Sequence, residues 1–267
     1  MAGLSISRAW DETRSVLAHE GRLIWTVALA LLVLPGAILG VVIPDAVTGT
    51  AALTGAIALP MLLVALIGLI GRLAIARLAL GGTVSVGQAI QEAVRRVPAA
   101  VAAFLLVMIP IAAALTPFVP ALLNAPQSPS PVAAWGSMIV LLLGFALGVR
   151  LLATVIPQVA AQGGGPVRLV KDSWRQTEGH WWKLIGFVLL FFVAAIVATR
   201  SLQWVVGGAV LVALGPIKAM SLGALVLAVV LTLVGSLFTT IFTVMLVRIY
   251  LQLSCNTPLA SVPSSRD

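Results

Sequence analysis

Six long apolar runs, separated by short polar segments, are the feature of this sequence that most restricts its fold. About 20 apolar residues in a helix of 1.5 Å rise per residue cross the roughly 30 Å hydrocarbon core of a bilayer. Hydrophobic residues make up 61% of the chain and charged residues only 9%, against roughly 25% charged residues in soluble domains. The sequence therefore predicts an all-α fold, a polytopic transmembrane bundle of six helices, with spans at residues 22–42, 51–75, 98–115, 132–156, 182–199 and 219–251.

Three basic amphipathic segments precede the first, third and fifth apolar runs. Apolar side chains recur at helical spacing on one face in residues 4–17, in residues 86–97 and after the glycines at 163–165. Helices of this kind lie in the interface between water and lipid. We expect three cytoplasmic amphipathic helices in addition to the six spans.

Lysine and arginine are distributed unequally between the two sides of the predicted bundle. All but two of the 16 fall on the side that holds the chain termini, and the exceptions are Arg200 and Lys218. Cytoplasmic loops of membrane proteins carry such an excess, so we expect both termini in the cytoplasm of a bacterial cell, with the protein in the inner membrane. The basic residues form no dense patch with interleaved aromatic residues, which argues against nucleic acid as a partner.

The apolar run at residues 204–214, which follows Arg200, is too short to cross a bilayer alone, at about 16 Å of helix. It has three possible placements: an extension of the fifth span, a re-entrant segment or a helix lying in the interface. We favour the interfacial helix.

We interpret residues 1–256 as one transmembrane domain and residues 257–267, which are polar and rich in proline and serine, as a disordered cytoplasmic tail. Residues 117–131 contain five prolines and predict a loop. Setting Ser5, Ser85 and Gly165 in register aligns three acids and three hairpins, which indicates a threefold repeat with units 1–80, 81–160 and 161–256. The alternative is that any protein built from hairpins has a similar rhythm of charges.

The sequence offers few groups for catalysis or metal binding. It has eight acids, none inside a predicted span, together with His19, His180 and the single Cys255. Acid–base catalysis and metal sites need such groups in clusters. We therefore predict no catalytic residue, no metal site, no cofactor and no enzymatic activity. Ion pairs on helix surfaces account for two of the acids, Glu92 with Arg95 and Arg96, and Asp172 with Arg175.

Two sets of residues are candidates for contact with a ligand. The first is a basic and aromatic cluster that we expect to anchor the protein among lipid headgroups, with anionic membrane phospholipid as the partner: Arg168, Lys171, Arg175, Trp181, Trp182 and Lys183. The second is a row of hydroxyls on one face of the sixth span that lines a polar path or a headgroup slot: Thr232, Ser236, Thr239, Thr240 and Thr243. The alternative for the second set is hydrogen bonding within or between packed helices.

Two small-residue pairs, Gly36 with Gly40 and Gly144 with Gly148, predict close helix approach. With six spans available, we expect packing inside the molecule rather than dimerisation.

The segment from Gly165 to Trp182, with Pro166, Ser173, Trp174 and Thr177 at its distinctive positions, resembles a motif of a broad group of bacterial six-span inner-membrane proteins. That group includes the membrane domain attached to some glycerophosphodiester phosphodiesterases. The segment 82–96 is similar to the middle amphipathic helix of the same group. The resemblance implies a topology rather than an activity, because the group is largely without assigned chemistry. These residues contain no counterpart of the catalytic barrel that hydrolyses phosphodiesters, so no phosphodiesterase residue is carried over.

Our first functional hypothesis is a non-enzymatic membrane component that handles or organises lipids or supports envelope homeostasis. The alternative is a permease or channel subunit for a small uncharged or amphipathic solute. A lateral opening between units with basic residues at headgroup level favours the first, and a tunnel lined by the hydroxyls of the sixth span favours the second.

Overall fold

The fold is known from a computed structural model that describes residues 5–45, 55–81, 84–116, 131–179 and 181–256. The predicted tail at 257–267 and the predicted loop at 117–131, except for Pro131, lie outside the described residues. All regular structure in the described part is helical. The elements are α1 (Ile6–Ala28), the π-helical turn η1 (Leu29–Val33), α2 (Leu34–Val42), α4 (Gly55–Ala79), α5 (Val86–Leu115), α7 (Pro131–Leu152), α8 (Val155–Ala161), α9 (Pro166–Gln176), α10 (Trp181–Leu214) and α11 (Leu222–Asn256).

Six helical stretches of the described chain are long and apolar enough to cross a membrane, which confirms the predicted fold class. They are Ile6–Val42, Ile57–Ala79, Val86–Ala114, Met138–Ala161, Trp181–Leu214 and Leu222–Ser254. The protein is an integral membrane protein with one such helical stretch for each predicted span.

Two of the three predicted amphipathic helices are not separate elements. The first continues through η1 and α2 to Val42, and the second continues through Pro98 to the end of α5. No glycine turn interrupts either junction, and a continued helix keeps its backbone hydrogen bonds inside the segment. Only α9 stands alone, because the chain turns at Gly179, which has a φ of +80°.

The fourth predicted span, placed at 132–156, is divided in the structure. Helix α7 ends at Leu152 and a short helix, α8, begins at Val155. Pro157 has no N–H to donate to the carbonyl of Ala153, so an unbroken helix would lose a bond at this point. The sequence prediction missed α8.

The prediction of an interfacial helix at residues 204–214 was wrong. Helix α10 runs without a break from Trp181 to Leu214 and so extends the fifth span through Arg200. The guanidinium of Arg200 donates to Gln203 on the same helix at 3.2 Å. No proline or glycine lies at 200–203, so nothing in the backbone ends the helix there.

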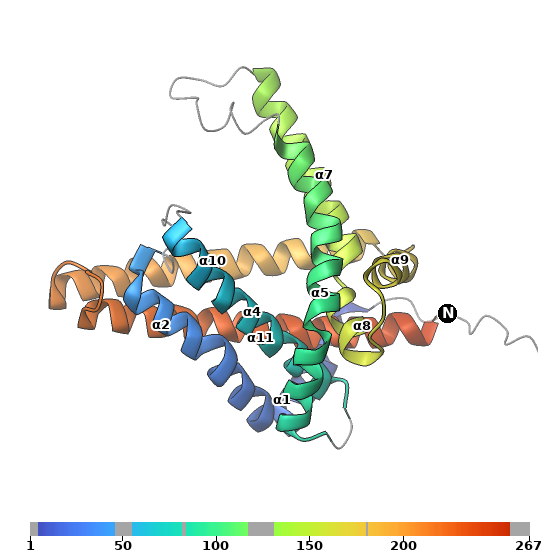
Figure 1. The fold of residues 1–267 in the computed structure, drawn as a ribbon, viewed down its shortest axis with the longest axis horizontal. Coiled ribbons are helices and arrows are strands. Elements are labelled where there is room, and N and C mark those ends of the chain that lie inside the picture. The colour runs from blue at the N-terminus through green and yellow to red at the C-terminus, as the bar shows by residue number, and fades with distance from the viewer. Residues whose placement is uncertain (1–4, 46–54, 82–83, 117–130, 180, 257–267) are drawn as a thin grey trace, which may run out of the picture.

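The spans form three helical hairpins that meet at one end and diverge at the other (Figure 1). The first pairs the continuous helix α1–η1–α2 with α4, the second pairs α5 with α7, and the third pairs α10 with α11. The second hairpin points away from the third, and α11 lies against α1, α2, α4 and α10.

The tightly packed core lies where the hairpins meet. Its larger cluster is rich in alanine, with Ala28, Ala74, Ala76, Ala89 and Ala103 among its buried members. Small side chains allow helix backbones to approach closely, which is the usual way in which helices pack in lipid. Along the hairpin arms many large apolar side chains are exposed instead, as lipid-facing surfaces require.

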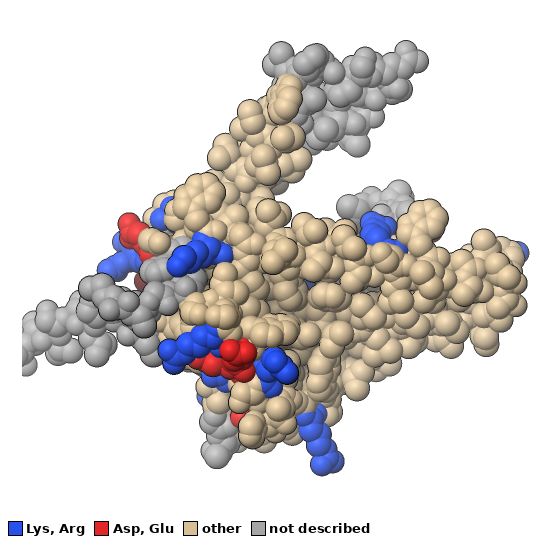
Figure 2. Space-filling model, turned by 180° about the vertical axis from the view of Figure 1, so that it is seen from behind, with Lys and Arg blue, Asp and Glu red and all other residues tan. Residues whose placement is uncertain are grey.

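Charged side chains are gathered at the same end of the molecule as this core. In the space-filling view they cluster where the hairpins meet, whereas the two long arms are largely uncharged (Figure 2). Arg200 and Lys218 are the basic residues on the third hairpin beyond its base. The base of the three hairpins is therefore the polar end of the protein.

The three segments that we aligned in the sequence begin their helices at the aligned positions. Ser5, Ser85 and Gly165 are the N-caps of α1, α5 and α9, and the serine hydroxyls accept from backbone N–H groups three residues later. The residues four and eight positions after each cap are buried: Ala9 and Thr13, Ala89 and Ala93, Leu169 and Ser173. This agreement concerns the helix starts and does not confirm a repeat of whole units.

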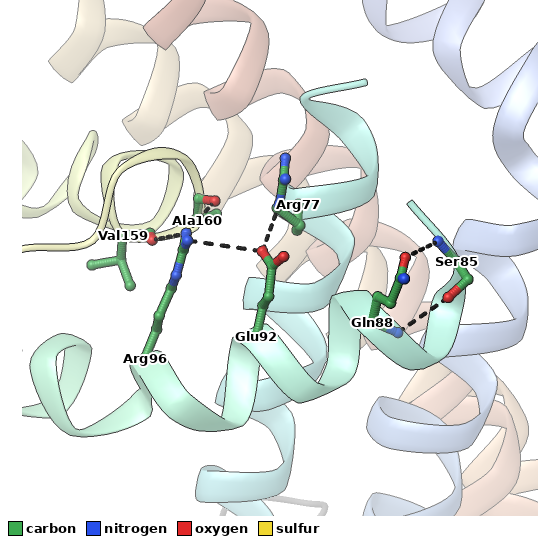
Figure 3. A network of polar contacts seen from close by, with 7 residues as sticks. All are labelled: Arg77, Ser85, Gln88, Glu92, Arg96, Val159 and Ala160. Atoms are coloured by element: carbon green, nitrogen blue, oxygen red, sulfur yellow. Dashed lines mark hydrogen bonds and ion pairs between the residues drawn. The ribbon is translucent and has the colours of Figure 1, made fainter. Parts of the chain in front are cut away.

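A polar network joins the first two hairpins at their base (Figure 3). Arg77 of α4 donates to Glu92 of α5 at 2.8 Å, and Arg96 lies 3.8 Å from the same carboxylate. Arg96 also donates to the carbonyls of Val159 and Ala160 in α8, at 2.7 and 2.6 Å. The Glu92 carboxylate therefore links α5 to α4, and Arg96 beside it links α5 to α8.

We expect the substitution Glu92→Gln to lower the free energy of unfolding by about 1 kcal/mol, because it removes the charge from a partly buried pair but keeps one acceptor oxygen. Thermal unfolding of the detergent-solubilised protein measures the loss, which should shrink as ionic strength rises. Glu12→Gln is the matched control, because Glu12 pairs only with Arg8 on its own exposed helix face. Equal losses for the two variants would contradict a linking role for Glu92.

Candidate functional site

A cavity of about 1230 Å³ lies between the three hairpins. Side chains of α4, of α5 and α7, and of α10 and α11 line it, so each hairpin contributes a wall. The lining is mainly apolar and includes Phe104, Phe145, Phe192 and Phe242. Phe104 and Phe192 are about half exposed, at 53% and 47%, so the cavity is open to the lipid-facing surface.

The cavity follows the helices over much of their length. Lining residues extend over positions 231–246 of α11 and over positions 188–203 of α10. At 1.5 Å per residue each stretch is about 22 Å long, compared with a hydrocarbon core of roughly 30 Å. The cavity therefore reaches across most of the thickness of a bilayer.

Polar side chains face the cavity at two depths. Arg72 of α4 lies toward the base of the hairpins, seven positions before the helix ends at Ala79. Thr199, Arg200 and Gln203 of α10 lie toward the other end, about 28 Å along that helix from Trp181. Between them the wall is apolar except for the hydroxyls of Thr232, Ser236 and Thr239 on α11.

Two glycines leave the cavity wall open. A Cβ atom added at Gly68 of α4 or at Gly235 of α11 would meet nothing within 4 Å. Gly144 of α7 differs, because an added Cβ would lie 2.9 Å from Ile111 of α5. A Cβ atom added at Gly36 would likewise lie 2.9 Å from Thr232 of α11, so one glycine of each predicted small-residue pair lies at a contact inside the molecule.

A second polar site surrounds the end of α7 at the base of the molecule. The guanidinium of Arg150 lies 3.5 Å above the ring of Trp174 in α9 and 5.8 Å from the ring of Trp181. Such a cation–π contact holds a charged group against an aromatic face at low cost in dehydration. Trp174 thus fixes the side chain of Arg150 against α9.

The hydroxyls of α9 bond to the same residue. Ser173 is fully buried and donates to the carbonyl of Arg150 at 3.1 Å, and Thr177 lies 3.4 Å from that oxygen. Thr154 donates to Ser173 at 2.7 Å. The last four carbonyls of a helix lack partners within the helix, so these hydroxyls satisfy the end of α7 and hold α9 onto it. Gly165 caps α9 and Pro166 occupies its first position, where proline is favoured.

The family model for the membrane domain of glycerophosphoryl diester phosphodiesterase matches residues 127–261, about half of the chain. The chain belongs to this family. No curated protein matches the chain, and no solved structure does. The match to the family membrane domain extends from α7 to α11, so it includes the docked α9 and several walls of the cavity. The serine, tryptophan and threonine that carried the resemblance are the residues that attach α9 to α7.

The residues that we predicted to anchor this protein among lipid headgroups lie on and beside α9. Arg168, Lys171, Arg175, Trp182 and Lys183 are exposed, and Trp181 is half buried with its ring centre 4.1 Å from that of Trp182. Their exposure leaves them free to contact lipid headgroups, and their contact with phospholipid stays a prediction.

The predicted row of hydroxyls divides into two groups. Thr232, Ser236 and Thr239 line the cavity, whereas Thr240 and Thr243 are buried and do not line it. The hydroxyls of Thr232, Ser236 and Thr243 donate to carbonyls of their own helix at 2.6 to 2.8 Å. The lining hydroxyls therefore offer the cavity acceptor lone pairs more than donors.

The predicted acid partners were correct in part. Glu92 does lie near Arg96, but its shorter contact is with Arg77 of another helix. Asp172 pairs with Arg168 at 3.5 Å, so the predicted partner Arg175 was wrong. In the described residues no group of three or more His, Cys, Asp or Glu side chains is placed to hold a metal ion.

Sequence reasoning missed the position of Arg72 and the role of Arg150. Arg72 falls inside the predicted second span, residues 51–75, near its exit, but we did not single it out as a site residue, and α4 continues beyond it to Ala79. The signal was present, because an ionisable residue inside an apolar run is costly and so points to a site. The stacking of Arg150 on Trp174 had no local signal, since the two residues lie on different helices.

Proposed function

We propose that this membrane protein is a non-enzymatic component that accommodates a membrane lipid in the cavity between its hairpins. The observation that carries the proposal is a cavity of about 1230 Å³ with apolar walls, about 22 Å long and open to the lipid-facing surface. Pockets for small molecules are typically about 300–1000 Å³, so this cavity has room for acyl chains.

The composition of the cavity wall supports binding rather than catalysis. Among the described lining residues there is no Asp, Glu, His, Cys, Lys or Tyr, so the serine and threonine hydroxyls of the wall have no adjacent general base to activate them. The remaining polar groups, arginine, glutamine and hydroxyls, are suited to orienting a headgroup.

The proposal includes the orientation that the charges favour. The base of the hairpins, with its lysines and arginines, faces the cytoplasm of a bacterial cell, and both chain termini lie on that side of the inner membrane. The exposed basic and aromatic residues of α9 and early α10 rest among anionic phospholipid headgroups, where each basic residue contributes about 1 kcal/mol.

A second candidate function is passage of a small uncharged or amphipathic solute, as in a permease or channel subunit. The observation that favours it is the presence of polar side chains at both depths of one continuous cavity, Arg72 near the base and Gln203 near the far end. A permease or channel function predicts that vesicles containing the protein take up a solute. Lipid binding alone predicts no uptake.

Filling the cavity tests the lipid proposal. We expect Gly68→Phe and Gly235→Phe to lower the amount of co-purified phospholipid by about tenfold, because each phenyl group projects into the cavity. Folding should be preserved, since a Cβ atom added at either position would meet no other atom within 4 Å. The lipid is measured by mass spectrometry after purification in an uncharged detergent.

Gly207→Phe is the matched control, because Gly207 of α10 is equally open but does not line the cavity. The control should retain lipid at the wild-type level. If both cavity variants fold and also retain wild-type amounts of lipid, the cavity is not the lipid site and the proposal fails.

A further inference from the structure

Arg72 carries a charge into the apolar cavity. It lies on α4 about 10 Å before the helix ends at Ala79, within the candidate span Ile57–Ala79. Its neighbours Gly71, Leu73, Ala74 and Ile75 are buried against other helices, whereas Arg72 is exposed and lines the cavity. The guanidinium therefore belongs to the cavity and not to the packed core.

Four other arginines at the base of the hairpins are held by the protein. Arg77 is bound by Glu92, Arg96 by two carbonyls of α8, and Arg248 by the carbonyl of Ala79 at 2.9 Å. Arg150 is stacked on an aromatic ring. In the part of the chain that the structure describes, Arg72 has no ion pair, hydrogen bond or ring contact. It differs from these four arginines in presenting five N–H donors for which the described residues offer no acceptor.

A guanidinium in an apolar cavity is costly unless an anion or another acceptor reaches it. The described lining contains no carboxylate that could neutralise it. A planar guanidinium matches the oxygens of a phosphate with two parallel hydrogen bonds, and arginine is favoured wherever phosphate is bound in this way. The missing partner is thus an anion with at least two oxygens.

We propose that Arg72 binds the phosphate of an anionic phospholipid whose acyl chains fill the cavity. This inference rests on the proposed function and names the class of lipid. The position of Arg72, about 10 Å before the end of α4, suits a headgroup that enters from the leaflet at the base of the hairpins. The apolar wall beyond it, about 22 Å along α10 and α11, takes the chains. A free phosphate ion would be paired with a single cation at this depth and would be surrounded by apolar walls. A phospholipid is therefore the better fit.

The test compares two lipids with the same chains, phosphatidylglycerol and diacylglycerol, which differ in the phosphate headgroup. The delipidated full-length protein is titrated with each in an uncharged detergent, and bound lipid is counted by native mass spectrometry. We expect the wild type to prefer phosphatidylglycerol and Arg72→Gln to reduce that preference about tenfold, with diacylglycerol binding unchanged. Arg72→Lys should keep part of the preference, because it retains the charge without the paired donors.

Arg95→Gln is the matched control, since Arg95 is an exposed arginine of the same end of the molecule that does not line the cavity. Its preference should equal that of the wild type. A titration with inorganic phosphate separates the two sources of the anion, and phosphate is expected to displace phosphatidylglycerol only weakly.

Three results would overturn the inference. They are a wild type without preference for phosphatidylglycerol, an unchanged preference in a folded Arg72→Gln variant, and displacement of the lipid by phosphate at equal concentration. Equal binding of both lipids by the wild type would refute the role of Arg72 and leave lipid binding intact. Binding of neither lipid would refute the proposed function as well. The wild-type preference is informative even if the glutamine variant does not fold.

Discussion

Replacing Gly71 with leucine is expected to lower the free energy of unfolding by about 3 kcal/mol. Gly71 is buried on α4 where this helix crosses the π-helical turn η1. A Cβ atom there would overlap the side chain of Leu32 and lie 3.1 Å from the Cβ of Leu31. Leu32 can turn away, but a Cβ atom is fixed to the backbone, so the two helices must separate. A loss of this size corresponds to a fall of about 6–12 °C in melting temperature.

Gly68→Leu provides the control for this experiment. Gly68 lies one turn earlier on the same helix and faces the cavity, with nothing within 4 Å of an added Cβ. Leucine favours helix over glycine by up to about 1 kcal/mol, so this variant should melt at or above the wild-type temperature. If the two substitutions shift the melting temperature equally, the close contact between α4 and η1 is not what holds the first hairpin together.

The second large effect is expected at the junction of α7 and α9. Ser173→Ala should lower the free energy of unfolding by about 2 kcal/mol, because it removes a buried bond to Arg150 and leaves the hydroxyl of Thr154 without its acceptor. Thermal unfolding in detergent measures the loss. Release of α9 should also speed trypsin cleavage at Lys171 and Arg175, which are already exposed.

Ser254→Ala is the matched control for the loss of a hydroxyl. Ser254 donates to the carbonyl of Tyr250 in its own helix at 2.6 Å, and that carbonyl keeps its partner in the helix when the hydroxyl is removed. This variant should lose less than about 0.5 kcal/mol. Unchanged proteolysis of Ser173→Ala would mean that the family motif does not dock α9 through this hydroxyl.

The contacts between α9 and α7 show why the family motif gives a topology more readily than a function. Ser173, Trp174 and Thr177 all face the end of α7, so their chemistry is used in attaching one helix to another. The cavity, in contrast, is built from leucine, valine, glycine and phenylalanine, which are common in any span. A ligand site made of common apolar residues has no motif to identify it.

The apolar runs and the shared register of three helix starts were readable from the sequence because both are local. A run of about 20 apolar residues must span lipid whatever its neighbours are, and six such runs gave six helices. The caps at Ser5 and Ser85 and the glycine before Pro166 act within a few residues of their own backbone. The resemblance to the family was also visible in a short local segment, residues 165–182.

Only the tertiary structure decided where helices continue and what faces the cavity. The continuation of α10 through Arg200 and the break before α8 depend on how backbone groups are satisfied, and a charge or a proline alone does not determine the outcome. The exposure of Arg72 depends on walls contributed by three hairpins that are far apart in sequence. Hydropathy records whether a residue prefers lipid, but a cavity arises from how helices diverge, and that geometry is set by long-range contacts such as those of Glu92 and Gly71.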